Sequence, residues 1–282
     1  MPCVDLPILQ RILMSILALV FALASAASPD ASTPQWETIQ PGMQQASVPV
    51  SAADSAAQVI VLRFDPHEWQ LEFAGSDGAD ARTRTAREWA KQADFSAVIN
   101  AGMFRRDYKT HVGFAQFRGQ LRNDRVNDYQ SVAAFDPRDA ALPAFHIFDL
   151  DAGSTMADIL KDYGSAVQNL RLIQRRGVNK WQKQTRRWSE AALAEDDGGR
   201  VLFIFCRAAY SMHDLNQLLL SAGIGVVAAQ HLEGGPEAQL YLHAGAVERE
   251  WFGSYETAFS ENDANVAAWP IPNVLGMRRR TP

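Results

Sequence analysis

Two glutamates flank a pair of glycines in the segment Leu-Glu-Gly-Gly-Pro-Glu, residues 232–237. The apolar runs 225–229 and 238–242 read as buried strands on either side of this segment, so the chain between them must turn sharply. Adjacent glycines permit the positive φ angles that such a turn needs, and they let a ligand approach the backbone closely. Glu233 and Glu237 would then stand at the two ends of a short loop, where carboxyl groups can serve as general acid and base. The competing interpretation is a plain turn whose glutamates are simply solvated.

A second polar segment, Asn-Ala-Gly-Met-Phe-Arg-Arg over residues 100–106, follows an apolar run that reads as a strand. The Asn100 amide offers a donor and an acceptor beside Gly102. It therefore suits either recognition of substrate hydroxyls or a cap that ties down the turn. Arg105 and Arg106 would add positive potential at the same strand end.

Arg187 is the best candidate to bind a phosphate, because a planar guanidinium can hold this group through two parallel hydrogen bonds. It closes the basic run 180–187, and the competing interpretation is a solvated surface arginine.

The N-terminus reads as a secretory signal peptide of residues 1–26. Arg11 precedes the apolar stretch 12–23, and small residues lead to a cleavage point after Ala26. This stretch is shorter than the about 20 apolar residues of a membrane span, and no later stretch of the sequence is long and apolar enough to cross a bilayer. We therefore expect a periplasmic or secreted protein with no stable membrane insertion after cleavage.

Charge and histidine spacing limit the partners and cofactors. The formal net charge is −5, which argues against a nucleic-acid partner because such binding relies on clustered Lys and Arg. His111, His213 and His231 lie near the candidate segments but show no metal-ligand spacing, so we predict no histidine-based metal site. A divalent cation held by carboxylates and carbonyls stays open. The acidic residues that could contribute to it are Asp107, Asp124 and Asp128.

Cysteine use offers a further, weaker alternative. Cys206 is the one cysteine that remains after signal cleavage, so no intrachain disulfide can form. It lies in the apolar run 201–206, where a thiol behaves as a small hydrophobe. Nucleophilic catalysis by Cys206 or Ser189 is therefore the weakest hypothesis, since no nucleophile elbow is recognisable.

The elements that must position these residues are mostly strands. Residues 27–56 are rich in Ala, Ser, Pro and Gln and read as a flexible spacer, which leaves 57–282 as one domain. We predict a hairpin of the strands 59–64 and 69–73, and helices at 85–92, 155–161 and 211–220. Further strands are predicted at 95–99, 112–117, 131–135, 145–148, 167–173, 190–193, 201–206, 225–229 and 238–242. This balance indicates an α+β (mixed α/β) fold around a large, mostly antiparallel or mixed sheet with a few packed helices.

The order and spacing of the segments resemble the phosphodiester glycosidase family, the family of the lysosomal uncovering enzyme. The resemblance runs from about Val59 to about Leu242, and the Asn-Ala-Gly-Met-Phe segment is its most specific part. In that family the late loop usually reads Leu-Asp-Gly-Gly followed by one residue and a serine. Glu233 and Glu237 therefore stand where the family has its aspartate and its serine.

The resemblance also points to residues upstream of this loop. Arg187-Trp188-Ser189 is similar to an Arg-Ser pair of the family with one residue inserted, and Gln168 matches the start of a Gln-Ser-Gly-Pro segment. The catalytic residues that we expect from the loop and the resemblance together are Glu233, Glu237 and Arg187. The expected substrate-binding residues are Asn100, Gly102, Arg105, Gln168, Ser189, Gly234 and Gly235.

The function that the resemblance implies is that of an exported hydrolase. It would cleave a sugar from a sugar-1-phosphate diester or a related envelope glycan. The alternative is a non-catalytic periplasmic glycan-binding or accessory protein that retains the family cleft. This alternative stays open because the usual aspartate and serine of the late loop are both replaced.

Overall fold

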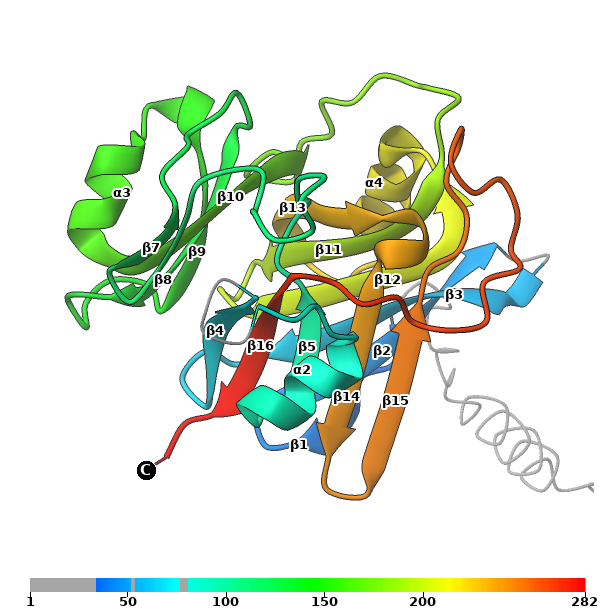
Figure 1. The fold of residues 1–282 in the computed structure, drawn as a ribbon, viewed down its shortest axis with the longest axis horizontal. Coiled ribbons are helices and arrows are strands. Elements are labelled where there is room, and N and C mark those ends of the chain that lie inside the picture. Colours follow the sequence, from blue (N-terminus) through cyan, green and yellow to red (C-terminus); the bar gives the residue numbers. More distant parts are fainter. Residues whose placement is uncertain (1–33, 52–53, 77–80, 282) are drawn as a thin grey trace, which may run out of the picture. The chain divides into compact units, whose positions relative to one another are not determined.

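Two sheets carry the fold, which the computed structural model describes for residues 34–51, 54–76 and 81–281 (Figure 1). The strands of the larger sheet are β1 (Glu37–Gln40), β2 (Met43–Ser51), β3 (Asp54–Phe64), β6 (Ala115–Phe117), β7 (Gln120–Asn123), β8 (Ser131–Pro137), β9 (Phe145–Asp149), β10 (Tyr163–Ile173), β11 (Trp188–Asp196), β12 (Val201–Tyr210) and β13 (Val226–Gly234). Their order is β1-β2-β3-β12-β11-β13-β10-β6-β7, while β8 pairs with β10 and β9 with β8. The predicted signal peptide lies outside the described residues.

The smaller sheet has the order β15-β14-β5-β16-β4. Its strands are β4 (Trp69–Gly75), β5 (Ala97–Asn100), β14 (Gln239–Ala244), β15 (Val247–Phe252) and β16 (Asn273–Arg279). All strand pairs in the described part of the chain are antiparallel. The prediction of a strand-dominated α+β fold is thus confirmed, but the expected single large sheet is in fact two.

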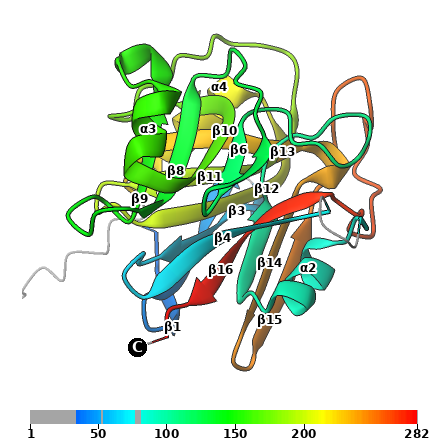
Figure 2. The same cartoon turned by 60° about the vertical axis from the view of Figure 1, so that its left-hand side comes forward.

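Three α-helices occur in the described residues, at positions close to those predicted. They are α2 (Ala86–Ala93), α3 (Met156–Asp162) and α4 (Met212–Ser221). Thr85 and Glu88 form a capping box at the start of α2, and the Ser211 hydroxyl accepts from the backbone N–H of Asp214 at the start of α4. Figure 2 shows α2 against the smaller sheet, where it packs on β5 and β14.

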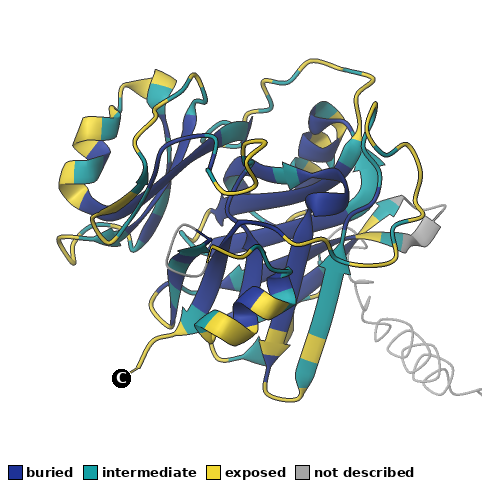
Figure 3. Cartoon of the chain, in the orientation of Figure 1, coloured by how far each residue is buried: buried dark blue, intermediate teal, exposed yellow. Residues whose placement is uncertain are grey.

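The main hydrophobic core is built by strands of both sheets. Leu62 of β3 and Phe203 of β12 belong to the same buried cluster as Leu240 of β14. The alternate residues of β12, Leu202 and Ile204, point the other way and join a second cluster with the apolar side chains of α4. Strand β12 is therefore buried on both faces, which explains the continuous apolar run in its sequence (Figure 3).

The predicted hairpin of the segments 59–64 and 69–73 is wrong. Strand β3 pairs with β2 and β12 in the larger sheet, whereas β4 pairs with β16 in the smaller one. The turn between them does form, because the Asp65 carbonyl accepts from the N–H groups of Glu68 and Trp69 at 3.1 and 2.9 Å. This turn carries the chain from one sheet to the other instead of pairing its two flanks.

The expected spacer at 27–56 is also wrong for residues 37–51, which form β1 and β2. Strand β2 pairs along β3 and buries Met43, Ala46 and Val48. Small and polar residues separate these buried positions, so the segment lacks the apolar density that would reveal a strand. The predicted strand at 112–117 is shorter than expected, because only Ala115–Phe117 pairs as β6.

The helices α2, α3 and α4 are all too short or too polar to cross a lipid bilayer, as is every helix in the described ranges.

Substituting Gly276 should destabilise the fold. Gly276 lies in β16, and a Cβ atom added there would overlap the ring of Phe95, which is itself buried. We expect Gly276→Ala to lower the free energy of unfolding by about 1–3 kcal/mol through overpacking. Chemical denaturation checks this, with Met277→Leu on the same strand as a volume-conserving control that should cost less than about 1.5 kcal/mol. Equal midpoints for Gly276→Ala and the parent protein would contradict the close packing on Phe95.

Candidate active site

The segment with the two glutamates forms the crossing from the larger sheet to the smaller one. Glu233 is the penultimate residue of β13, and the short 3-10 helix η2 (Gly235–Glu237) leads into β14. Gly235 has the positive φ that the turn requires, +63°, whereas Gly234 is extended at −122°. Figure 3 shows this crossing as largely buried.

Both glycines also make room for neighbouring side chains. A Cβ atom at Gly234 would lie 2.8 Å from Cδ1 of Trp188, and one at Gly235 would lie 2.6 Å from Oε2 of Glu256. The absent side chains therefore let an indole and a third carboxylate approach the loop backbone. Glu256 lies far from this loop in the sequence, and the fold brings it there.

Glu233, Glu237 and Glu256 form what we call the acidic cluster. Burial raises the pKa of Glu233 to about 8, although His231 and the Gly234 N–H oppose this rise; the Glu237 and Glu256 carboxylates add to it. Burial, with a further contribution from Glu256, raises the pKa of Glu237 to about 7. Burial also raises the pKa of Glu256. With pKa values of about 8 and 7, Glu233 and Glu237 hold protons near neutral pH more readily than ordinary glutamates, which suits general acid catalysis.

A buried ion pair lies next to the acidic cluster. His231 Nδ1 is 2.6 Å from Glu190 Oε1, and Trp188 Nε1 donates to Glu190 Oε2 at 2.7 Å. Burial alone would lower the pKa of His231, but Glu190 outweighs it, with Glu233 and Glu256 in support, so the pKa of His231 is raised. Because residues i and i+2 of a strand share one face, His231 brings positive charge to the same side as Glu233.

Asn100 holds the loop from the smaller sheet. Its Nδ2 donates to the Glu237 carbonyl at 2.9 Å, and its Oδ1 accepts from the Gln239 N–H at 2.7 Å. Of the two roles predicted for Asn100, the structure shows the second: its side chain holds the turn in place by hydrogen bonds. The side chain is 1% exposed, so a direct contact with substrate would require one of these bonds to break.

Gln168 and Gly102 support the same region. The Gln168 amide accepts from the N–H groups of Phe114 and Asn127 and donates to the carbonyls of Asn127 and Tyr129. All of its hydrogen-bonding capacity is thus used within the protein. Gly102, with φ at +151°, leaves the space that His111 and Asn169 fill.

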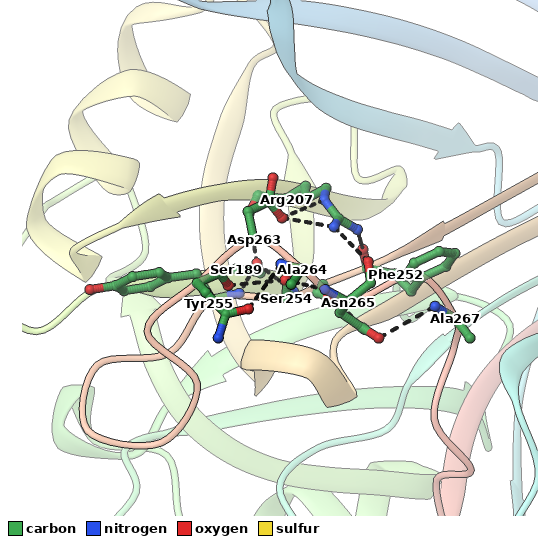
Figure 4. A network of polar contacts seen from close by, with 11 residues as sticks. Ser189, Arg207, Phe252, Ser254, Tyr255, Asp263, Ala264, Asn265 and Ala267 are labelled. Carbon is green, nitrogen blue, oxygen red and sulfur yellow. Dashed lines mark hydrogen bonds and ion pairs between the residues drawn. The ribbon is translucent and has the colours of Figure 1, made fainter.

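Ser189 braces the back of the loop (Figure 4). Its hydroxyl donates to the Arg207 carbonyl at 2.6 Å and accepts from the N–H of Ser254 at 3.0 Å. The Arg207 guanidinium in turn donates to the Phe252 carbonyl and pairs with Asp263. The segment fixed in this way packs on the loop, because a Cβ atom at Gly253 would overlap the Gly235 carbonyl.

Neither proposed nucleophile is available for catalysis. The Ser189 hydroxyl is fully buried and engaged in the hydrogen bonds described above. Cys206 is also fully buried, and burial raises the pKa of its thiol to about 12. A thiol that stays protonated and inaccessible is a structural residue, so the hypothesis of nucleophilic catalysis by these two residues is wrong.

The candidate cations lie at the surface. Arg187 is exposed, and its backbone pairs with Thr257, next to Glu256. Two positive charges oppose the raised pKa of Glu256: His231 contributes more, and the exposed Arg186, next to Arg187, contributes less. Arg105 and Arg106 are exposed as well.

No group of three or more His, Cys, Asp or Glu residues in the described ranges is arranged to hold a metal ion. Of the acidic residues considered for a cation, Asp107 is occupied locally. Its carboxylate accepts from the hydroxyl and the N–H of Thr110, and the hydroxyl contributes most to lowering the pKa of Asp107 to about 2. Asp124 and Asp128 are exposed.

Comparison with known proteins identifies the family. A model of the phosphodiester glycosidase family matches residues 93–278. This chain belongs to the phosphodiester glycosidase family. No curated protein sequence is similar enough to match.

Solved structures share the phosphodiester glycosidase fold. The catalytic domain of zebrafish N-acetylglucosamine-1-phosphodiester alpha-N-acetylglucosaminidase, auto-inhibited by its pro-peptide, is 13% identical with a TM-score of 0.62, and the match covers 88% of each chain. A hypothetical protein from Synechocystis is 14% identical with a TM-score of 0.59, covering 89% of this chain and 64% of that one. At these identities the likeness concerns the fold.

Several residues of this phosphodiester glycosidase site have no signal in the sequence. Glu256 stands in an irregular segment, and Glu190 lies within an apolar strand where no spacing links it to His231. Arg186 is one of several cations in a basic run. Pairing of β11 with β13 and packing of the segment after β15 bring these residues together.

Stability should fall as pH rises from 5 to 8. In the unfolded chain the carboxyls of Glu233 and Glu237 lose their protons near 4.5, whereas in the folded protein their pKa values are about 8 and 7. The folded state then binds more protons over this range, so its stability decreases with pH. Thermal unfolding of Glu233→Gln should show a smaller decrease between pH 5 and pH 8 than the parent protein. The exposed Glu261→Gln serves as control, and parallel curves for all three proteins would contradict the raised pKa of Glu233.

Proposed function

We propose that this protein is an exported hydrolase that cleaves a sugar from a sugar-1-phosphate diester or a related envelope glycan. The observation that supports it is the acidic cluster, which a phosphodiester glycosidase fold holds at the crossing between its two sheets. A carboxyl group that is protonated at neutral pH and a second one that ionises more readily provide the acid and the base of a glycosidic cleavage.

In the proposed step Glu233 is the general acid, because it has the higher pKa of the two loop glutamates. It donates its proton to the phosphate oxygen as the bond from that oxygen to the anomeric carbon breaks, and the bonding electrons leave with the phosphate. A water oxygen forms the new bond to the anomeric carbon, and ionised Glu237 accepts the water proton. The products are the free sugar and a phosphate monoester.

The phosphate needs a positively charged partner, and two adjacent arginines are candidates. Arg187 has the position implied by the family resemblance, while Arg186 is the residue whose charge reaches Glu256. We propose that Arg186 makes the main contact with the phosphate and that Asn100 and Ser189 position the loop. The place of action is the periplasm or the exterior of the cell, as the predicted signal peptide suggests.

Replacing Glu233 should abolish hydrolysis. Purified protein that begins at Ala27 is incubated with a panel of sugar-1-phosphate diesters, and release of free sugar is measured with and without a chelator. We expect Glu233→Gln to reduce kcat by about 10²–10⁴-fold, the usual contribution of a general acid. Glu261→Gln, with its exposed side chain, should retain full activity. Full activity in Glu233→Gln would refute the acid role. Binding of the diesters without turnover by the folded parent protein would favour the glycan-binding alternative.

The two arginines can be separated by substitution. We expect Arg186→Ala to lower kcat/KM for the diester about 10–100-fold, because it removes a charge-assisted hydrogen bond worth about 1.5–3 kcal/mol. Arg187→Ala changes the same residue type at the next position and should stay within about twofold of the parent. The opposite ranking in steady-state kinetics would assign the phosphate to Arg187.

A further inference from the structure

A cavity of about 180 Å³ opens beside the Asn-Ala-Gly-Met-Phe segment. Its lining combines buried side chains with two cations and a threonine: Phe73, Ser76, His111, Asn273, Thr110, Arg122 and the exposed Lys109. A larger hollow of about 610 Å³ lies elsewhere, but its cation, Arg207, is already bound to Asp263 and to backbone carbonyls. The smaller cavity differs because three of its buried side chains, Ser76, His111 and Asn273, have polar atoms without a partner among the described residues.

Four buried polar atoms of residues that line this cavity lack hydrogen-bond partners in the part of the chain that the structure describes. They are Ser76 Oγ, His111 Nδ1 and both amide atoms of Asn273. The three side chains are 1%, 4% and 3% exposed. Buried polar groups are nearly always satisfied, so several unsatisfied atoms around one cavity indicate a site that a polar ligand completes.

The chemistry of these atoms selects the ligand. His111 Nε2 lies 3.1 Å from the Gln168 carbonyl and must donate to it, which leaves Nδ1 as an acceptor. Burial lowers the pKa of His111 to about 4, so the ring is neutral. Asn273 offers one donor and one acceptor, and the Ser76 hydroxyl can do either. Hydroxyl groups match this set because each both donates and accepts. A phosphate or carboxylate only accepts, so it cannot satisfy the acceptors His111 Nδ1 and Asn273 Oδ1. Lys109 and Arg122 disfavour a cation.

Two short chains of contacts connect the cavity to the acidic cluster. In the first, the Ala101 N–H donates to the Asn273 carbonyl, and the neighbouring Asn100 holds the Glu237 carbonyl. In the second, His111 contacts Gln168, which in turn donates to the Tyr129 carbonyl. The pKa of Tyr129 is raised by burial and, to a smaller extent, by Asp128 and Glu233.

We propose that this cavity binds the sugar ring of the substrate, through ring hydroxyls that pair with Ser76, His111 and Asn273. Phe73 supplies an apolar wall for the ring carbons. The inference rests on the proposed function for the class of ligand, since a glycosyl phosphodiester brings a neutral polyhydroxyl ring attached to an anionic group.

The test measures binding separately from turnover. Isothermal titration of Glu233→Gln protein uses the 1-phosphates of glucose, galactose, mannose and N-acetylglucosamine, with inorganic phosphate as a separate arm. Adding Ser76→Ala to the Glu233→Gln protein should weaken binding of the sugar phosphates about tenfold and leave the affinity for inorganic phosphate unchanged. Ser131→Ala is the matched control, because its hydroxyl is also buried and unpartnered among the described residues but lies on β8, away from the cavity.

A second variant guards against loss of folding. Asn273→Leu replaces both unpartnered amide atoms by apolar groups of similar shape, so thermal stability should be unchanged or higher while sugar binding is lost. The inference is wrong if the parent protein hydrolyses a diester and both cavity variants, Ser76→Ala and Asn273→Leu, hydrolyse it with the same KM. It is also wrong if none of the four sugar phosphates binds, because water would then be the only occupant of the cavity. If the parent hydrolyses no diester but Ser76→Ala still weakens sugar binding, the proposed hydrolysis fails and the cavity assignment stands.

Discussion

The withdrawal of three carboxyl groups from water, where the chain crosses between its two sheets, is the constraint on which the site depends. An isolated buried carboxylate is costly, so the group responds by keeping its proton. That response lasts only while the loop is held in place. Asn100 holds it from the smaller sheet, and the network of Ser189 and Arg207 braces it from behind (Figure 4). The raised pKa values of the acidic cluster and the rigidity of the loop therefore depend on the same packing.

Local sequence patterns predicted the three helices and most strands, but not β1, β2, β7, β15 or β16. The helices that begin after Thr85 and Ser211 are capped by hydrogen bonds to the backbone three residues later, and the buried strands appear in the sequence as apolar runs. Pairing between strands depends on distant residues. The turn at 65–68 therefore looked like a hairpin although its strands belong to different sheets. Strand β2 was not predicted, because its buried residues are separated by small and polar ones.

The candidate site was predicted in part, for a similar physical reason. Glu233 and Glu237 lie close together in the sequence, so the glycine turn between them could be read directly. Glu256 and the Glu190 partner of His231 reach the site through tertiary packing, which no spacing encodes. Gln168 shows the converse: the family resemblance suggested recognition of substrate, but every polar atom of its amide is bound within the protein. A polar residue in a distinctive motif can serve geometry as well as chemistry.

The crossing from β13 to β14 also has a consequence for the order of folding. These two strands are consecutive in the chain, yet they belong to different sheets. Asn100, which makes two hydrogen bonds to the crossing, lies on β5 of the smaller sheet. An intermediate with only the larger sheet formed would leave Glu233 and Glu237 in solvent with the acidity of ordinary glutamates. The raised pKa values of the site therefore arise only once both sheets are formed.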